Sequence, residues 1–165
     1  MEQESKSNNI LYAIIGVSLI GFIDALYLFY SELTGNFNCL INKGIFECEA
    51  VNTSVYAKFL GVHVSLWGII FYLIVTLLVF LIIYEKNIYW LSFFLPAIGL
   101  LGLLFSVYLT IVEIAIIRAL CEFCLLSAVC SVTIFVLVLI AKYKEFSSIF
   151  AKLDFWNFYI KEETE

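Results

Sequence analysis

The sequence predicts an all-α integral membrane protein, a bundle of four transmembrane helices capped by a long, cysteine-bearing first outer loop. The 165 residues are 64% hydrophobic and 14% charged, whereas soluble domains are about 45–50% apolar and about 25% charged. Four apolar stretches reach the roughly 20 helical residues that a bilayer core of about 30 Å requires. Each stretch is continuous and lacks a period of two, which favours helices over a barrel. A soluble enzyme is therefore excluded.

We expect the four spans at residues 10–30, 64–84, 88–117 and 121–141. The N-terminal tail, residues 1–9, is a poor signal peptide because it is acidic and no small-residue cleavage site follows it. The third span is overlong, and Pro96 should lie in its first turns or kink it. Residues 142–165 mix aromatic and charged side chains, a pattern typical of an interfacial amphipathic helix or a tail rather than a fifth span.

The connections between the spans differ strongly in length. Three residues join the second and third spans, whereas the first connection covers residues 31–63. Loops of this length are usually functional, and the glycines and cysteines in this one predict a cap over one membrane face. Four spans place both termini on the same side. Lys and Arg near the membrane number four on that side and three on the other, which predicts cytoplasmic termini and an outer loop.

Four of the five cysteines should share that outer face. Cys39 and Cys48 lie in the long loop, and Cys121 and Cys124 form a C-x-x-C where the fourth span begins. Thiol–disulfide exchange proceeds through a mixed disulfide, so a relay needs a mobile pair within reach of a fixed pair. The start of a helix favours a thiolate through its dipole and free N–H groups. We therefore expect Cys121 or Cys124 to be the more acidic thiol.

Other functions fit the same cysteines. Two structural disulfides could tie the loop down, or four sulfurs could bind zinc, although the spacing of nine positions between Cys39 and Cys48 is unlike a zinc knuckle. We therefore expect no metal. Cys130 lies mid-span and is assigned to packing. A net charge of −5 with nine basic residues argues against a nucleic-acid partner, so membrane lipid is the expected surrounding.

Two carboxyl groups fall within predicted spans, Asp24 in the first and Glu113 in the third. Because charge is costly at membrane depth, each is a candidate for ligand contact or proton relay. His63 stands at the junction of loop and helix, where a capping or interfacial role is favoured over catalysis. A small transporter or assembly factor using Asp24 or Glu113, with cysteines only as staples, is the alternative function.

Three motifs in combination carry a family resemblance. Cys39 is followed by Cys48-x-x-Val51-x-x-Ser54, then by GVHVSLWGIIFY at residues 61–72, and finally by the C-x-x-C that begins at Cys121 and continues as Leu-Leu-Ser-Ala. Over nearly all of the four-span region the chain resembles the vitamin K epoxide reductase family, including its bacterial and archaeal homologues. The resemblance implies four helices around a quinone near the C-x-x-C, beneath a loop that carries shuttle cysteines.

The resemblance also implies a role for each matching residue. Cys39 and Cys48 would be the shuttle pair that accepts electrons from a partner thiol, and Cys48 would form a transient disulfide with Cys121. Cys124 would face the quinone and reduce it. Ser54 matches a loop serine tied to loop conformation and activity. The expected quinone contacts are Val64, Trp67, Phe71, Phe123 and Ala128.

Departures from the animal members favour the microbial activity. Val64 and Ala128 stand where those enzymes have Asn and Tyr linked to vitamin K binding, and His63 replaces a proline of many microbial members. We therefore expect oxidation of a thioredoxin-fold protein coupled to reduction of menaquinone, ubiquinone or a similar quinone. Residues 142–165 are too short for a fused thioredoxin-like domain, so the partner should be separate. Another four-span enzyme class performs this net reaction, but its C-x-x-C lies in the first outer loop, the reverse of the order here.

Overall fold

The structure is a computed structural model. It describes the backbone of residues 2–37, 46–84 and 89–162, and the side chains of residues 9–37, 46–84 and 93–142. Cys39 lies outside the described residues. The statements below concern the described parts of the chain.

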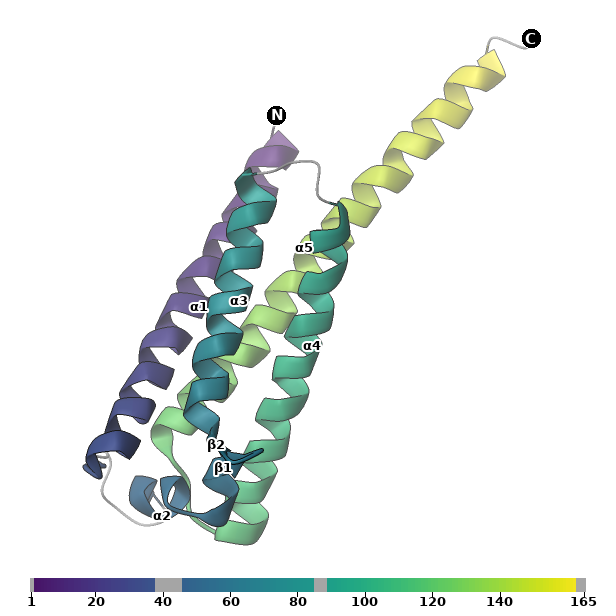
Figure 1. The fold of residues 1–165 in the computed structure, drawn as a ribbon. Helices are drawn as coiled ribbons and strands as arrows, with labels where there is room; N and C mark the ends of the chain where they lie inside the picture. The colour runs from purple at the N-terminus through teal and green to yellow at the C-terminus, as the bar shows by residue number, and fades with distance from the viewer. Residues whose placement is uncertain (1, 38–45, 85–88, 163–165) are drawn as a thin grey trace.

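Four long helices form an antiparallel bundle (Figure 1). They are α1 (Glu2–Thr34), α3 (Val64–Tyr84), α4 (Tyr89–Val112) and α5 (Glu122–Glu162). α1 packs against α3 and α5, and α4 packs against the same two helices, so the four surround a common centre. Each contains a segment long and apolar enough to cross a membrane, at Asn9–Thr34, Val64–Tyr84, Phe93–Ile117 and Glu122–Lys142. The predicted four-span bundle is confirmed.

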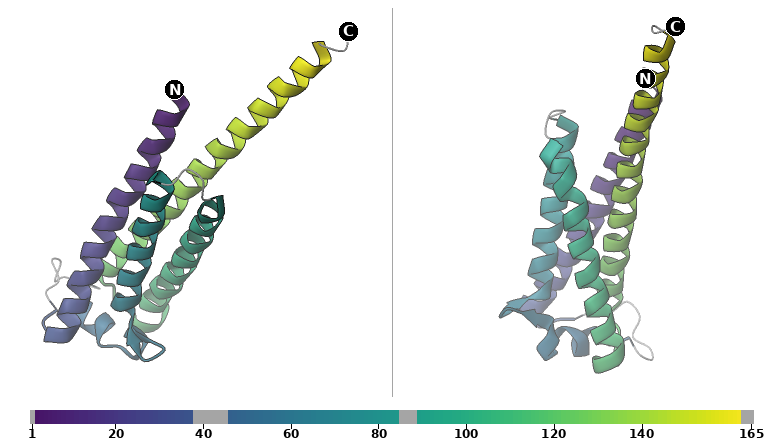
Figure 2. Two further views of the ribbon diagram at one scale, coloured as in Figure 1. Left: turned by 45° about the horizontal axis from the view of Figure 1, so that its top comes forward. Right: turned by 90° about the vertical axis from the view of Figure 1, so that its right-hand side faces the viewer.

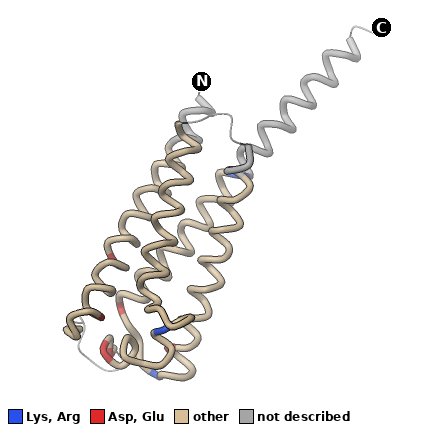
Figure 3. Tube along the Cα trace, in the orientation of Figure 1, with Lys and Arg blue, Asp and Glu red and all other residues tan. Residues whose placement is uncertain are grey.

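Each span buries only a narrow stripe of its surface. Ile14, Tyr72, Val75 and Ile134 are almost fully buried where the helices meet, while large apolar side chains elsewhere on the same helices are exposed. Such a surface would be unfavourable in water but suits contact with lipid. The charged side chains that the structure describes gather mainly at one end of the bundle (Figure 3).

Both terminal segments are helical. α1 begins at Glu2, so residues 2–9 extend the first helix, and α5 continues to Glu162 without a break. The assignment of residues 1–9 and 142–165 to the cytoplasm or the membrane interface stays a prediction. The sequence has no glycine or proline after Gly102, and without such a breaker a helix that has started can propagate.

The third span ends differently from a regular helix. α4 contains Pro96 near its start, and its α-helical part ends at Val112. The next turn, η2 (Glu113–Ile117), is a π-helix, and Arg118 then adopts a left-handed conformation with φ of 59°. Single π-helical turns are frequent at functional sites. The turn brings the chain round to Cys121.

The first connection is more structured than a simple loop. It contains α2 (Cys48–Asn52), the 3-10 turn η1 (Val55–Ala57), and the antiparallel hairpin of β1 (Lys58–Phe59) and β2 (Val62–His63). Leu60 and Gly61 link the strands with φ of 55° and 80°, which matches a two-residue turn that requires positive φ at both positions.

These elements form a cap at one end of the bundle, opposite the start of α1 and the end of α5 (Figure 2). The cap is attached to the segment that precedes α5. Phe46 and Leu120 form a parallel β-bridge, and the Glu47 N–H donates to the Leu120 carbonyl at 3.1 Å. This attachment holds the start of α2 beside the C-x-x-C.

Candidate redox site

Cys121 is the N-cap of α5. Its carbonyl accepts the Leu125 N–H at 2.9 Å, the first helical hydrogen bond, and its sulfur accepts the Cys124 N–H at 3.4 Å. A side chain that accepts from the third helical residue is the usual N-cap arrangement, here made by a thiol. Cys124 therefore lies one turn into the helix, with its sulfur beside that of Cys121.

The Cys121 sulfur is fully buried yet well supplied with donors. The Cys124 thiol, the Cys124 N–H and, at 3.7 Å, the Asn52 amide all hydrogen-bond to it. These hydrogen bonds lower the pKa of Cys121 despite its burial. The hydrogen bond from the Cys124 thiol has the largest effect. Donors to a thiolate favour the charged form, which is the nucleophile in exchange reactions.

Cys48 lies against the C-x-x-C. It begins α2, is buried, and is disulfide-bonded, whereas Cys121 and Cys124 carry free thiols. Cys48 and Cys121 belong to one buried cluster together with Leu28, Val51 and Ala119. Pairing of Cys48 with Cys39 stays a prediction because Cys39 is outside the described residues.

Asn52 connects the two cysteines. Its amide donates to the Cys48 carbonyl at 2.9 Å and to the Cys121 sulfur at 3.7 Å. Ser54 supports the same short helix, since its hydroxyl donates to the Val51 carbonyl at 2.7 Å. Sequence reasoning missed Asn52. Its position four residues after Cys48 and two before Ser54 was the available signal.

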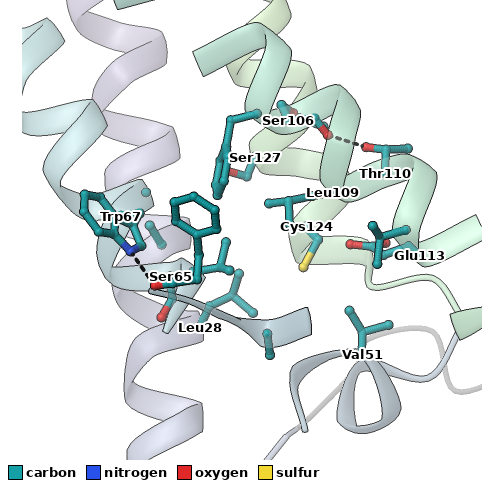
Figure 4. A pocket seen from close by; sticks show the side chains of 18 of the residues that line it. Leu28, Val51, Ser65, Trp67, Ser106, Leu109, Thr110, Glu113, Cys124 and Ser127 are labelled. Carbon is teal, nitrogen blue, oxygen red and sulfur yellow. Dashed lines mark hydrogen bonds between the residues drawn. The ribbon is translucent and has the colours of Figure 1, made fainter. Parts of the chain in front are cut away.

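A cavity of about 470 Å³ lies between the four helices beneath the cap, and Cys124 lines it (Figure 4). Of the predicted ligand contacts, Val64, Trp67, Phe71 and Ala128 also line it, as does Ser54. Phe123 does not line the cavity. Its ring packs on Tyr27 instead, with centroids 4.6 Å apart. Cys121 is sealed between cap and bundle, so Cys124 is the cysteine of the pair that reaches the cavity.

A comparison with known families covers most of the chain. Residues 12–139 match the Vitamin K epoxide reductase family, a range that includes the second and third spans, the cap, both cysteine motifs and most of the first and fourth spans. The chain belongs to the vitamin K epoxide reductase family. No curated protein matches it. As a member of this family it is a multi-pass membrane oxidoreductase.

Aromatic contacts join the cap to the helices that line the cavity of this family member. Phe59 at the hairpin lies edge-on to Trp67 of α3 and to Phe105 of α4, with centroids 6.2 and 5.5 Å apart. The Trp67 indole N–H donates to the Phe59 carbonyl at 3.3 Å. Sequence reasoning missed Phe59 and Phe105, because only the fold brings β1 beside α4.

Glycines let the aromatic walls lie close to neighbouring backbones. A Cβ at Gly102 of α4 would collide with the Phe71 ring, and one at Gly21 of α1 would collide with the Tyr72 ring. The Tyr72 hydroxyl lies 2.9 Å from the Ser127 carbonyl and 2.8 Å from its hydroxyl. Both residues line the cavity, so this apolar chamber contains a small polar corner.

Two acidic groups on α1 have different surroundings. Glu32 lines the cavity, accepts a hydrogen bond from the Ser65 hydroxyl, and lies 3.2 Å from Nδ1 of His63. His63 itself is not a lining residue and connects β2 to the end of α1. Asp24 is buried deeper, and neither carboxyl oxygen has a hydrogen-bond partner among the described residues.

The described part of the chain contains no group of three or more His, Cys, Asp or Glu side chains that could bind a metal ion.

Proposed function

We propose that this protein is a quinone-linked, disulfide-forming oxidoreductase. A reduced thioredoxin-fold partner passes electrons to the Cys39–Cys48 pair, and they continue through Cys121 and Cys124 to a membrane quinone. One observation carries the proposal: Cys48 and Cys121 share a buried cluster, while the adjacent Cys124 opens onto the cavity. Three sulfurs thus lie in the order that electron transfer from the cap to the bundle centre requires.

The exchange step conserves atoms and electrons. The Cys48 thiolate attacks the Cys121 sulfur of a Cys121–Cys124 disulfide, a Cys48–Cys121 bond forms, and Cys124 leaves as a thiolate. Cys39 then resolves the mixed disulfide, which returns Cys48 to a disulfide and leaves Cys121 reduced. Free thiols at Cys121 and Cys124 beside a disulfide-bonded Cys48 correspond to this state. A potential difference of about 30 mV, worth roughly 1.4 kcal/mol, favours such a two-electron step tenfold.

The cavity fits a quinone ring. Its volume lies within the roughly 300–1,000 Å³ of ligand sites, which are mostly apolar with a few polar groups. Trp67 and Phe71 provide flat apolar walls, and the hydroxyls of Tyr72 and Ser127 are available to carbonyl oxygens. A bound quinone would supply the two-electron acceptor, and the protein would position it against Cys124 and exclude water.

The cap is the proposed docking side for the partner. The cap carries Cys48, and the start of α1 and the end of α5 lie at the opposite end of the bundle (Figure 1). The count of Lys and Arg residues supports cytoplasmic termini and a cap on the outer face. The outer face is the side on which disulfides persist. The thioredoxin-fold partner is proposed to be a separate protein.

Reconstitution tests the proposed function. The purified protein in lipid should reduce menaquinone or ubiquinone, followed by quinone absorbance, when a reduced thioredoxin-fold protein is added. Serine at Cys39, Cys48, Cys121 or Cys124 should abolish this reaction. Cys130→Ser is the matched control, because Cys130 packs in the helical core away from the relay, and it should retain activity. A wild-type protein that reduces no quinone would contradict the proposal.

Trapping tests the electron path separately. Cys124→Ala removes the sulfur that competes for Cys121, so a mixed disulfide between Cys48 and Cys121 should accumulate after the loop pair is reduced and reoxidised. Mass spectrometry of the digested protein would detect the linked peptides. The same protein with Cys48→Ser added should show none. Linked peptides that join other cysteines would contradict the path.

Asp24 is the residue that favours a second candidate function. A buried carboxyl group with no hydrogen-bond partner among the described residues is what a transporter or assembly factor with structural cysteines would use. That function predicts that Cys48→Ser leaves activity intact while Asp24→Asn abolishes it. The relay predicts the reverse, and Asp24 is not among the residues that line the cavity.

A further inference from the structure

Glu113 is a carboxyl group placed at the redox cysteines by a special turn. It begins the π-helical turn η2 at the end of the third span, and it is only 4% exposed. Among the described residues no Lys, Arg or His forms a salt bridge with it. A buried carboxyl group without a cationic partner is costly at this depth, so it points to a function.

Its contacts are with the C-x-x-C. Oε2 of Glu113 accepts the Cys121 N–H at 3.2 Å, and the carboxyl group also accepts from the Cys124 thiol, whose single hydrogen is shared between Glu113 and the Cys121 sulfur. Glu113 and Cys124 both line the cavity and lie next to each other in Figure 4. The backbone hydrogen bond fixes the carboxyl group against Cys124 and toward the space proposed for the quinone.

We propose that Glu113 is the general base that takes the proton of the Cys124 thiol and delivers it to the reduced quinone. This inference rests on the proposed function. In the balanced reaction the dithiol loses two electrons and two protons, the Cys121–Cys124 bond forms, and the quinone becomes a quinol. One proton moves from Cys124 through Glu113, which ends as it began. The other comes from the Cys121 thiol or, when Cys121 is already a thiolate, from water.

The neighbouring sulfur cannot replace Glu113 in this step. Cys121 is the other group bonded to the Cys124 thiol, but a proton passed to Cys121 stays on the dithiol, and both sulfurs must be free of protons before they can join. Glu113 is the contact that removes the proton from the pair. The other titratable side chains lining the cavity are Glu32 of α1, Tyr56 of the cap and Tyr72 of α3.

Glu113→Gln is the discriminating variant. Glutamine can still accept the Cys121 N–H but cannot take a proton. With dithiothreitol as the donor, so that no partner protein is needed, turnover with quinone should fall about 100-fold or more, in the range for loss of a general base. KM for the quinone should stay within about twofold. The turnover rate of the Glu113→Gln protein should rise with pH over the range in which the wild-type rate is constant, because hydroxide must then remove the proton from the Cys124 thiol.

Two further variants complete the test. Glu113→Asp retains a base and should recover part of the lost rate. Glu49→Gln, which changes an exposed carboxylate of α2, is the matched control and should behave as wild type.

Either of two results would overturn the inference. The first is a Glu113→Gln protein whose turnover stays within about threefold of wild type at every pH. The second is a Glu113→Gln protein whose turnover falls equally at every pH, so that the pH profile stays that of the wild type, and whose unfolding temperature is lower. That result would make Glu113 a structural residue. Wild-type protein that reduces no quinone would instead reject the proposed function.

Discussion

Replacement of Asn52 by leucine isolates the electrostatic part of the redox site. The Asn52 amide is 3.7 Å from the Cys121 sulfur, and leucine keeps the approximate size of the side chain without the donor. A hydrogen bond to a charged group contributes about 1.5–3 kcal/mol. Because this contact is long and is one of three donors to the sulfur, we take about 1.4 kcal/mol, which corresponds to a rise of about one pH unit in the pKa of Cys121.

Ultraviolet absorbance of the thiolate during a pH titration measures this change. In a Cys130→Ala background, Cys121 should titrate below the ordinary pKa of a cysteine thiol, since its hydrogen bonds lower the pKa. Asn52→Leu should move that midpoint upward by about one pH unit.

Thr53→Ala is the matched control for this titration. Thr53 is the next residue, its hydroxyl donates to the Glu49 carbonyl at 2.7 Å, and its loss should leave the midpoint unchanged. Equal midpoints for Asn52→Leu and the wild type would refute the assignment of the amide as a donor to the thiolate.

Two other substitutions test the cavity and the buried acid. Gly102→Ala should push the Phe71 ring into the cavity. KM for quinone, measured by quinone absorbance, should then rise about tenfold, since overpacking costs about 1–3 kcal/mol. Gly16→Ala is the control and should leave KM unchanged, because an added Cβ there meets no described atom within 4 Å. Asp24→Leu should raise the free energy of unfolding by about 1–3 kcal/mol in thermal denaturation, because it removes buried oxygens that have no hydrogen-bond partner among the described residues. Quinone reduction should persist, and lost activity would favour the transporter.

The sequence could place those residues of the predicted site that are close together in the chain. The spacing of Cys121 and Cys124 at a helix start was readable because one helical turn sets their separation. Cys48 and Cys121 are 73 residues apart, and their shared side of the membrane followed from counting spans. Their contact in one buried cluster did not follow from that count, because it depends on the bridge between Phe46 and Leu120.

The position of Phe123 depends on the rotation of its helix. Its place inside the C-x-x-C suggested a ligand contact, but on a helix adjacent residues point about 100° apart. With Cys124 directed into the cavity, Phe123 is turned toward α1, where it meets Tyr27. Only the rotation of α5 against its neighbours decides which of the two reaches the ligand space.

The sequence by itself determined four segments long and apolar enough to cross a membrane, and it predicted two cysteine pairs on one side, because apolar length and residue spacing are local properties of the chain. The tertiary structure decided that Cys124 opens onto the cavity, that Asn52 joins Cys48 to Cys121, and that Glu113 meets both cysteines of the C-x-x-C. Those contacts depend on how the helices rotate, on the π-helical turn and on where the cap attaches. Such features arise from packing among distant segments, which no local pattern records.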